Sequence, residues 1–305
     1  MTKIQRSLNP PSLEPLLRNK AIFYRFCLAQ NIPVPALYAI GFGQASNWTH
    51  LGWIPGGTEQ WLAFVERELP VEFVVKPVEG AFGQGVRLFR RQNGRFTDAA
   101  GAEYSAAAIW EFLRNSYRKG FLIQERLRNH PRLLELTGVE YLQTVRLTTL
   151  VGADQQAHVI HAHLKLITGS NVTDNFDGGL TGNLQARVDL QNGRLIRPVT
   201  ASANTPGYIL LQRHPNTGQD LEGFPVPLWA QATDLVRRAA LRFLPVRTIG
   251  WDVALTPAGA VIVEGNIWWD PSNQHQNLHT VLQTIRDLCP SAMQPVPEPS
   301  AGRRA

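Results

Sequence analysis

A lysine followed by three glycines is the stretch of this sequence best suited to binding phosphate. Lys76 ends a β-branched run, and Gly80, Gly83 and Gly85 follow before a second apolar run begins. Glycine lets backbone N–H groups approach an anion closely, because it has no Cβ. A lysine at the end of the preceding strand adds a mobile positive charge. The pattern therefore predicts a strand, a phosphate-binding flap and a second strand.

The flap does not match the phosphate motifs that open a helix. Neither Gly-x-x-x-x-Gly-Lys-Ser/Thr nor Gly-x-Gly-x-x-Gly fits the spacing of these glycines. An ordinary glycine-rich hairpin with an exposed lysine is the alternative interpretation, and these residues alone leave it open.

A second polar group, near the end of the chain, could hold a divalent cation. Glu264 and Asn266 are two residues apart on an expected strand, so their side chains share one face. Asp252 lies on the strand before it. Two carboxylates side by side are costly unless a cation joins them, and Mg²⁺ prefers such oxygen ligands. The alternative is an exposed polar hairpin.

The register of this hairpin decides whether the acids meet. A three-residue turn at 257–259 would place Asp252 directly opposite Glu264. A turn of two or four residues would place Asp252 opposite Val263 and weaken the metal interpretation. The predicted metal site assumes the three-residue turn.

Composition limits the class of protein. The 305 residues are 44% apolar and 18% charged, as in globular domains with a real core. A net charge of +6 favours anionic ligands, but no arginine–aromatic cluster or known module indicates nucleic acid. Cys27 and Cys289 stand in unrelated contexts, so we expect no disulfide framework. No signal peptide or membrane span is recognisable, and the sequence predicts a cytoplasmic protein without a membrane partner.

Strands and helices mix without strict alternation, and expected hairpins favour antiparallel sheet, so the sequence predicts an α+β fold. A loose arm is expected before the first helix and a disordered tail at the C-terminus. The expected helices are 13–30, 58–69, 105–117, 228–243 and 275–288. The expected strands are 38–43, 73–76, 86–90, 121–124, 142–151, 158–167, 184–190, 248–255 and 260–264.

The order of these motifs resembles that of the ATP-grasp superfamily. Asn19-Lys20 and the later Asn-Ile-Pro-Val-Pro35 resemble its entry segment, and Phe121–Glu125 resembles the strand leading to its nucleotide hinge. Thr144-Val-Arg146 resembles its Asp-Ile-Arg motif, with threonine in place of aspartate. The ending Gly-Trp-Asp-Val, Glu-Gly-Asn and Asp-Pro-Ser-Asn-Gln is most similar to the sugar-transfer-associated group, relatives of the α-L-glutamate ligase type.

The resemblance covers about residues 15–290 and implies an ATP-grasp fold. Two α+β subdomains would bind a nucleotide between them, without the family's usual N-terminal domain. The implied division is an arm at 1–14, an N-terminal subdomain with the flap at 15–125, a C-terminal subdomain with the metal hairpin at 126–290, and a tail at 291–305.

The resemblance also implies roles for single residues. ATP would be held through its phosphates by Lys20, Lys76, Gly80, Gly83 and Gly85, and through its adenine by Gln124, Glu125 and Leu127. Catalytic cations facing the transferred phosphate would be Arg146 and Lys165. Mg²⁺ would be held by Asp252, Glu264 and Asn266.

The acceptor site is the least defined. We expect its lining among Asn175, Asp177, Asn183, Trp268 and Asp270, although a solvated loop and packing tryptophans are the alternative. Ile267-Trp-Trp-Asp270 stands where many family members carry Pro-Arg, an arginine that often handles the acceptor carboxylate. His161 and His163 share a strand face, but no acid or cysteine has matching spacing, so structural histidines are favoured over a metal site.

The predicted function is that of an ADP-forming ligase that uses ATP and Mg²⁺. A small-molecule carboxylate would form an acyl phosphate, which an amine or another nucleophile then attacks. A kinase that phosphorylates a hydroxyl group and a non-catalytic nucleotide-binding protein are the alternatives.

Overall fold

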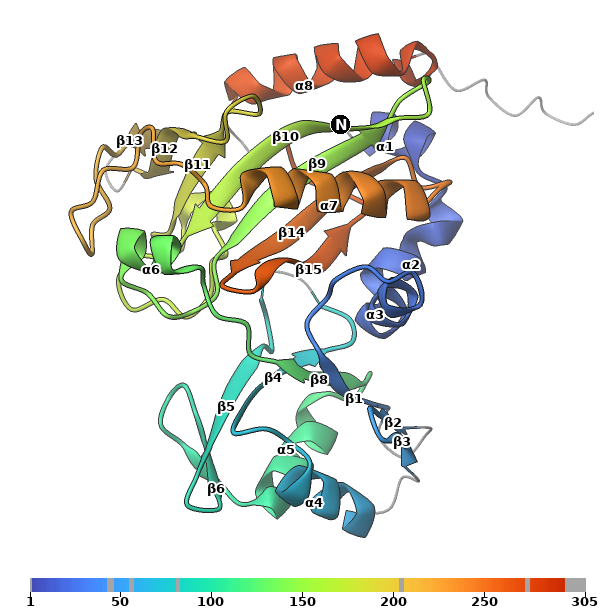
Figure 1. The fold of residues 1–305 in the computed structure, drawn as a ribbon, viewed down its shortest axis with the longest axis vertical. Coiled ribbons are helices and arrows are strands. Elements are labelled where there is room, and N and C mark those ends of the chain that lie inside the picture. The colour runs from blue at the N-terminus through green and yellow to red at the C-terminus, as the bar shows by residue number, and fades with distance from the viewer. Residues whose placement is uncertain are drawn as a thin grey trace, which may run out of the picture.

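The computed structural model describes residues 2–42, 47–54, 58–80, 83–202, 206–271 and 275–293. It contains two antiparallel sheets, one above the other in Figure 1, each with its own helices. The first sheet has the strand order β3-β2-β1-β8-β4-β5-β6-β7, and the second has β13-β12-β11-β10-β9-β14-β15. The predicted α+β fold is confirmed.

The first sheet encloses an aromatic core with helices α4 and α5. Trp61 of α4 stacks on Trp110 of α5 with ring centroids 4.9 Å apart, above Phe73 and Phe89 of the sheet. The elements are β1 (Leu37–Gly41), β2 (Asn47–Thr49), β3 (Gly52–Ile54), α4 (Thr58–Arg67), β4 (Glu72–Pro77), β5 (Arg87–Gln92), β6 (Arg95–Asp98), β7 (Glu103–Tyr104), α5 (Ala106–Ser116) and β8 (Phe121–Glu125).

The second sheet carries α7 on one face and α8 on the other. Leu147 of β9 packs in the core that α7 covers, whereas Leu150, three residues on, packs with α8. The elements are α6 (Pro131–Thr137), β9 (Thr144–Val151), β10 (Ala157–Leu166), η2 (Asp177–Gly179), β11 (Leu184–Val188), β12 (Leu195–Ala201), β13 (Tyr208–Leu210), α7 (Trp229–Arg242), β14 (Thr248–Thr256), β15 (Gly259–Asn266), α8 (His275–Leu288) and η3 (Pro290–Met293).

The N-terminal residues are not a loose arm, which corrects the prediction. They form α1 (Thr2–Leu8), followed by η1 (Pro11–Leu13). Asn9 is buried, and its side-chain amide donates to the carbonyl of Thr248 at 2.8 Å and accepts from the backbone of Arg247 and Thr248 at 3.0 Å. These bonds fix the segment to the second sheet. Of the predicted tail, residues 294–305 lie outside the described part of the chain.

The first predicted helix is broken at Asn19 into α2 (Glu14–Arg18) and α3 (Lys20–Ala29). Asn19 has extended backbone, and its side chain accepts from the N–H of Ile22 at 3.1 Å, which is an N-cap. The break starts α3 at Lys20, whose own N–H donates to the carbonyl of Val78 at 2.9 Å. Both helices pack on the second sheet, although they precede the first in sequence.

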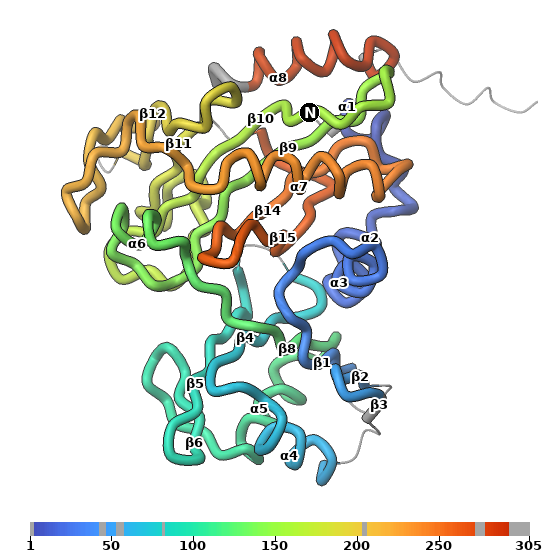
Figure 2. Tube along the Cα trace, viewed as in Figure 1, coloured from blue at the N-terminus to red at the C-terminus, as the bar shows by residue number. Residues whose placement is uncertain are grey.

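Some short elements of the structure were not among those predicted. The polar, proline-containing segment after β8 forms α6, whose Leu133 and Leu136 enter the core of the second sheet. Figure 2 shows the chain crossing here from one sheet to the other. No helix among the described residues is long and apolar enough to cross a membrane.

The prediction of a three-residue turn between β14 and β15 is wrong. Thr256 pairs with Gly259, so the turn has only two residues between its paired ends. Asp252 nevertheless lies opposite Glu264, because the register shifts between Asp252 and Val253. Val263 is the extra residue of a β-bulge.

Candidate active site

A row of polar side chains crosses the second sheet from edge to interior. Glu264 pairs with Asp252, Asp252 with Arg146, Arg146 with His163, and His163 with Arg187. Directly opposed residues of an antiparallel pair point to the same face. Five side chains from five neighbouring strands therefore lie side by side on one face.

The bulge at Val263 brings Glu264 into this row. Ile262 packs in the main core, and a regular strand would send Glu264, two residues later, to that core as well. The extra residue reverses the alternation, so that Glu264 shares the face of Asp252. Gly265 then faces the core, where a Cβ would come within 2.5 Å of Leu17. The two predicted metal ligands thus meet through a bulge that the sequence did not reveal.

Arg146 and Lys165 neutralise Asp252. The Arg146 guanidinium donates two hydrogen bonds to the Asp252 carboxylate in a bidentate contact, at 2.7 and 2.9 Å. The Lys165 ammonium lies 3.2 Å from the same carboxylate. Burial would raise the pKa of Asp252, but these two cations outweigh burial and hold the pKa well below its usual range. Burial would lower the pKa of Arg146 and of Lys165, but the nearby carboxylates outweigh burial and raise both pKa values.

Lys76 of the first sheet faces the acids of the second. Burial lowers the pKa of Lys76 to about 8, with a contribution from the charge of Lys20. The carboxylates of Glu264, Asp252 and Asp174 act in the opposite direction, so these acids lie within electrostatic reach of Lys76. Residues far apart in sequence therefore act on one another electrostatically across the two sheets.

Lys20 connects the flap to the acidic hairpin. Its ammonium donates to the carbonyl of Gly80 at 2.9 Å and lies 3.6 Å from the Glu264 carboxylate. At the other end of the flap, the Tyr117 hydroxyl donates to the carbonyl of Gly85 at 2.5 Å. Both ends of the flap are thus held by side chains outside it.

The middle of the flap reaches the second subdomain. Gly83 has a φ of +70°, and a Cβ there would lie 3.4 Å from the methyl group of Thr173. The flap therefore lies against the loop after β10. Gly83 needs the left-handed conformation that favours glycine.

The predicted hinge residues lie at the junction of the two sheets. The carboxamide oxygen of Gln124 is 2.9 Å from the hydroxyl of Tyr24, and the carboxylate of Glu125 accepts from the N–H of Ala36 at 3.1 Å. Leu127 packs with Ala254 and Val263, the bulge residue.

The predicted acceptor residues divide between structural and exposed positions. Asn183 is buried, and its amide group donates to the carbonyls of Thr173 and Asn175 at 2.8 and 2.7 Å and accepts from Thr168 at 3.1 Å. It holds the loop after β10 together. Asp177 is exposed on the 3₁₀ turn of that loop.

The two tryptophans after β15 serve packing. Trp269 is buried, donates to the hydroxyl of Thr248 at 2.9 Å, and packs against α8. Trp268 packs on the main core, and Asp270 is exposed. Asn266 donates to the carbonyl of Gly250 at 3.3 Å, which leaves its oxygen available.

Asp174, which the sequence suggested only as a possible lining residue of the acceptor pocket, lies beside the proposed catalytic cations. Its carboxylate accepts from the hydroxyl and the N–H of Thr144, at 2.5 and 2.9 Å, and lies 3.5 Å from Lys165. Threonine stands at position 144 where the family pattern has aspartate. That replacement was the signal in the sequence that could have indicated Asp174, because the loss of a carboxylate beside Lys165 suggests that another carboxylate takes its place.

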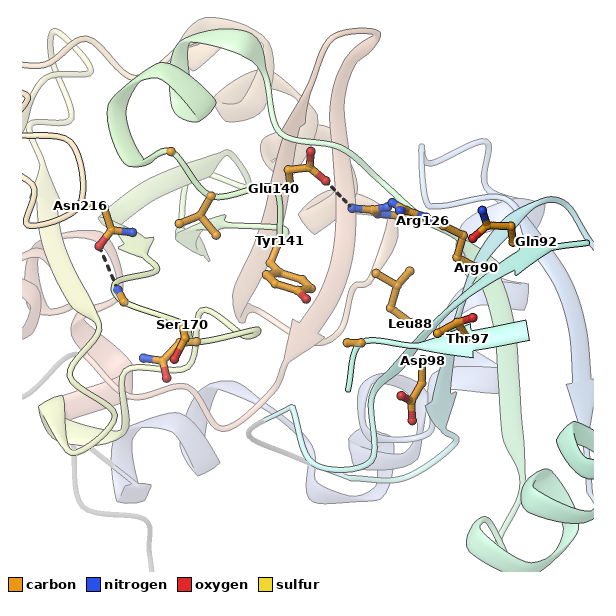
Figure 3. Close-up of a pocket in the computed structure, with 15 residues that line it drawn as sticks. Leu88, Arg90, Gln92, Thr97, Asp98, Arg126, Glu140, Tyr141, Ser170 and Asn216 are labelled. Atoms are coloured by element: carbon orange, nitrogen blue, oxygen red, sulfur yellow. Dashed lines mark hydrogen bonds and ion pairs between the residues drawn. The ribbon is translucent and has the colours of Figure 1, made fainter. Parts of the chain in front are cut away.

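A cavity of about 580 Å³ opens between the two sheets, beside the hinge. Figure 3 shows Arg126 pointing across it to Glu140, 3.3 Å away, with Tyr141 and Asn216 on the side of the second sheet. Its lining does not include Lys76 or the acidic hairpin. The cavity is therefore distinct from the place where Lys20 and Glu264 approach each other.

The donor set suits Mg²⁺, although no group of three or more His, Cys, Asp or Glu side chains forms a metal cluster in the described ranges. Asp252, Glu264 and Asn266 offer two carboxylates and a carboxamide oxygen on one sheet face. Mg²⁺ is usually held by one or two carboxylates, with substrate phosphates completing its shell. The residues present therefore fit a magnesium ion that arrives with a nucleotide.

The two α+β subdomains, the glycine flap and the acidic hairpin define a protein of the ATP-grasp fold. A family model described as sugar-transfer associated ATP-grasp matches residues 1–287, so the chain belongs to this family. A comparison with curated proteins gave no significant match.

Solved structures similar to this chain include three ATP-grasp and synthetase proteins. A RimK domain protein ATP-grasp from Sphaerobacter thermophilus is 17% identical, with a TM-score of 0.42, covering 90% of this chain and 67% of that one. N5-carboxyaminoimidazole ribonucleotide synthetase from Thermotoga maritima is 11% identical, with a TM-score of 0.44, covering 90% of this chain and 49% of that one. N5-carboxyaminoimidazole synthetase from Staphylococcus aureus, complexed with ADP, is 11% identical, with a TM-score of 0.49, covering 92% of this chain and 53% of that one. The chain thus spans about half to two thirds of these structures.

Proposed function

We propose that this protein is an ATP-dependent, ADP-forming ligase that joins a carboxylate to an amine or another nucleophile through an acyl phosphate. The observation that carries the proposal is the placement of Lys76, on the first sheet, within electrostatic reach of Asp252 and Glu264, which pair with each other on the second sheet. Membership of the ATP-grasp family supports the same reaction class.

The cations of the site are suited to a triphosphate. Lys20 and Lys76 enter from the side of the flap, and Arg146 and Lys165 lie on the second sheet. In this structure they neutralise the carboxylates of the site. A bound triphosphate would give them a second anionic partner, so we expect their contacts to Asp252 and Glu264 to rearrange on binding.

Arg146 and Lys165 are proposed to face the transferred phosphoryl group and the acyl phosphate. Such groups act by position and charge, because charge develops on phosphate oxygens during transfer. Asp252, on the sheet, orients Arg146, and Asp174, in the loop after β10, orients Lys165. Asp252, Glu264 and Asn266 would hold Mg²⁺, which when bound neutralises phosphate charge.

The flap would exclude water from the reactive intermediate. It is held by Lys20 at Gly80 and by Tyr117 at Gly85, and Gly83 reaches Thr173 of the opposite subdomain. Closure over the phosphates would protect an acyl phosphate from hydrolysis.

The test is ADP release from Mg²⁺-ATP with pools of candidate carboxylates and amines. Loss of one well-placed cation, as in Lys76→Ala, should slow ADP release by about 10²–10³-fold. Glu264→Ala should show a comparable loss. ADP release by either variant at the rate of the unmodified protein would contradict the proposal. A stable phosphorylated product formed without an amine would indicate a kinase instead.

A further inference from the structure

The polar row of the second sheet continues past the proposed phosphate-facing cations. Thr148 lies on β9 two residues after Arg146, on the same face, and pairs with His161 of β10. Thr148 is fully buried, and its hydroxyl has no hydrogen-bond partner among the described residues. Buried hydroxyl groups are nearly always hydrogen-bonded, so this one points to a missing polar partner.

His161 and His163 form a pair with spare hydrogen-bonding capacity. His163 Nδ1 lies 3.2 Å from His161 Nε2, and both side chains are buried. Burial lowers the pKa of His161 to about 4 and that of His163 well below its usual range, so both rings are neutral near pH 7. Two neutral rings that share one hydrogen bond keep one N–H and one lone pair for another group, whichever tautomer is present.

Arg187 lies one strand further along the row. Its neighbours Ala186 and Val188 pack in the main core, so Arg187 faces the histidine side of the sheet. It is half-buried, and its side chain forms no ion pair or hydrogen bond with any residue in the described ranges. Its charge contributes to the lowered pKa of His161, which places the guanidinium within electrostatic reach of the pair.

These side chains form one group, which we name the polar subsite: Thr148, His161, His163 and Arg187. We propose that the polar subsite binds an oxyanion, a carboxylate or a phosphate group, of the substrate other than ATP. The proposal rests on the ligase function above and adds the place where the second substrate is held. This substrate would extend from Arg146, at the proposed transferred phosphate, toward β11.

The chemistry of the subsite favours an anion over a neutral group. A guanidinium has five donors and no acceptor, and the threonine hydroxyl and one histidine N–H add two more donors. An oxyanion can accept such hydrogen bonds and also balances the charge of Arg187, which has no ion-pair partner in the described part of the chain. A neutral hydroxyl group would leave that charge without a partner.

Nitrogen-15 NMR of the histidine rings tests the proposal directly. The protein, labelled on histidine and saturated with Mg²⁺-ADP, is titrated with succinate in one arm and orthophosphate in the other. We expect saturable shifts of the His161 and His163 ring nitrogens in at least one arm, and the active arm identifies the class of oxyanion. Unmoved resonances in both arms would overturn the proposal.

Arg187→Gln supplies the comparison, because it removes the charge while keeping a polar side chain. Loss of a charge-assisted hydrogen bond should weaken binding of the probe about 10- to 100-fold. The control is Arg237→Gln, because Arg237 is exposed on α7 at the opposite face of the sheet. This variant makes the same charge change and should bind the probe as tightly as the unmodified protein does. Equal affinity of Arg187→Gln and Arg237→Gln would also overturn the proposal.

ADP binding, measured on the same samples by calorimetry, separates this proposal from the ligase function. If the unmodified protein binds no Mg²⁺-ADP, the proposed function fails. If it binds Mg²⁺-ADP but neither anion moves the histidine resonances, only the polar subsite fails. Arg187→Lys retains the charge and should keep binding within about tenfold, which gives a second variant should Arg187→Gln not fold.

Discussion

Asp252 lies directly opposite Glu264 because Val263 is an extra residue in β15. The hairpin turn is too short to give this register in a regular ladder. A single bulge therefore sets the geometry on which the proposed magnesium site depends.

Glu264→Gln should remove most of the Mg²⁺ dependence of ADP binding. The substitution keeps the size and polarity of the side chain but removes a carboxylate that Mg²⁺ prefers. We expect the gain in ADP affinity on adding Mg²⁺ to shrink by about tenfold or more, as one charged ligand is lost. Calorimetric titrations with and without Mg²⁺ measure this gain.

The control for Glu264→Gln is Glu135→Gln, a carboxylate on the exposed surface of α6. It should leave the Mg²⁺ effect unchanged. Equal Mg²⁺ effects in Glu264→Gln and the unmodified protein would exclude Glu264 as a metal ligand.

Nucleotide affinity should fall above about pH 8. Burial lowers the pKa of Lys76 to about 8, so its ammonium loses the proton above that pH and no longer attracts phosphate. The ADP dissociation constant should then rise by up to about tenfold per pH unit. Lys76→Arg should remove this dependence, because a guanidinium stays charged. The same pH profile in both proteins would show that another group titrates.

Asp252→Asn should destabilise the fold itself. The substitution leaves Arg146 and Lys165 buried without their shared carboxylate, and breaking a buried pair in this way typically costs about 3–5 kcal/mol. Urea unfolding measures the change. Asp220→Asn, which removes an exposed partner of Arg213, should cost less than about 1 kcal/mol. A loss of similar size in both variants would argue against a buried charge cluster.

Gly83→Ala should weaken nucleotide binding through the flap. The backbone at Gly83 is left-handed, which costs an alanine roughly 1–2 kcal/mol, and the new Cβ would contact Thr173. We expect ADP affinity to drop by up to about tenfold. Gly94→Ala has the same backbone strain at a turn where a Cβ meets nothing within 4 Å. If Gly94→Ala weakens ADP binding as much, the effect is on stability and not on the flap.

Long elements with a clear pattern could be predicted from the sequence. The helix at 275–288 has the predicted bounds, and the long apolar runs that became β9, β10 and β14 were recognised as strands. Short strands such as β2 and β7 were missed, because two or three residues carry no periodicity. The N-terminal helix was missed because Asn9 and Gln5 stabilise it through bonds to residues distant in sequence.

The candidate site, too, could be predicted only in part from the sequence. Motif spacing pointed to Lys76 and Glu264 separately, and the family resemblance implied a shared nucleotide site. The fold adds that Glu264 lies within electrostatic reach of Lys76. The bulge at Val263 has no signature in composition, because it depends on packing on both sides of β15. Asp174 entered the site through a loop that Asn183 holds, a tertiary effect beyond local patterns.

The central claim is that one nucleotide bridges the two sheets. A crystal structure of the protein with Mg²⁺ and the non-hydrolysable analogue AMP-PNP tests it most directly. The account predicts the triphosphate between Lys76 on β4 and the Asp252–Glu264 pair, with the flap closed over it. A nucleotide bound elsewhere, or a phosphate chain that reaches only one of the two sheets, would contradict it.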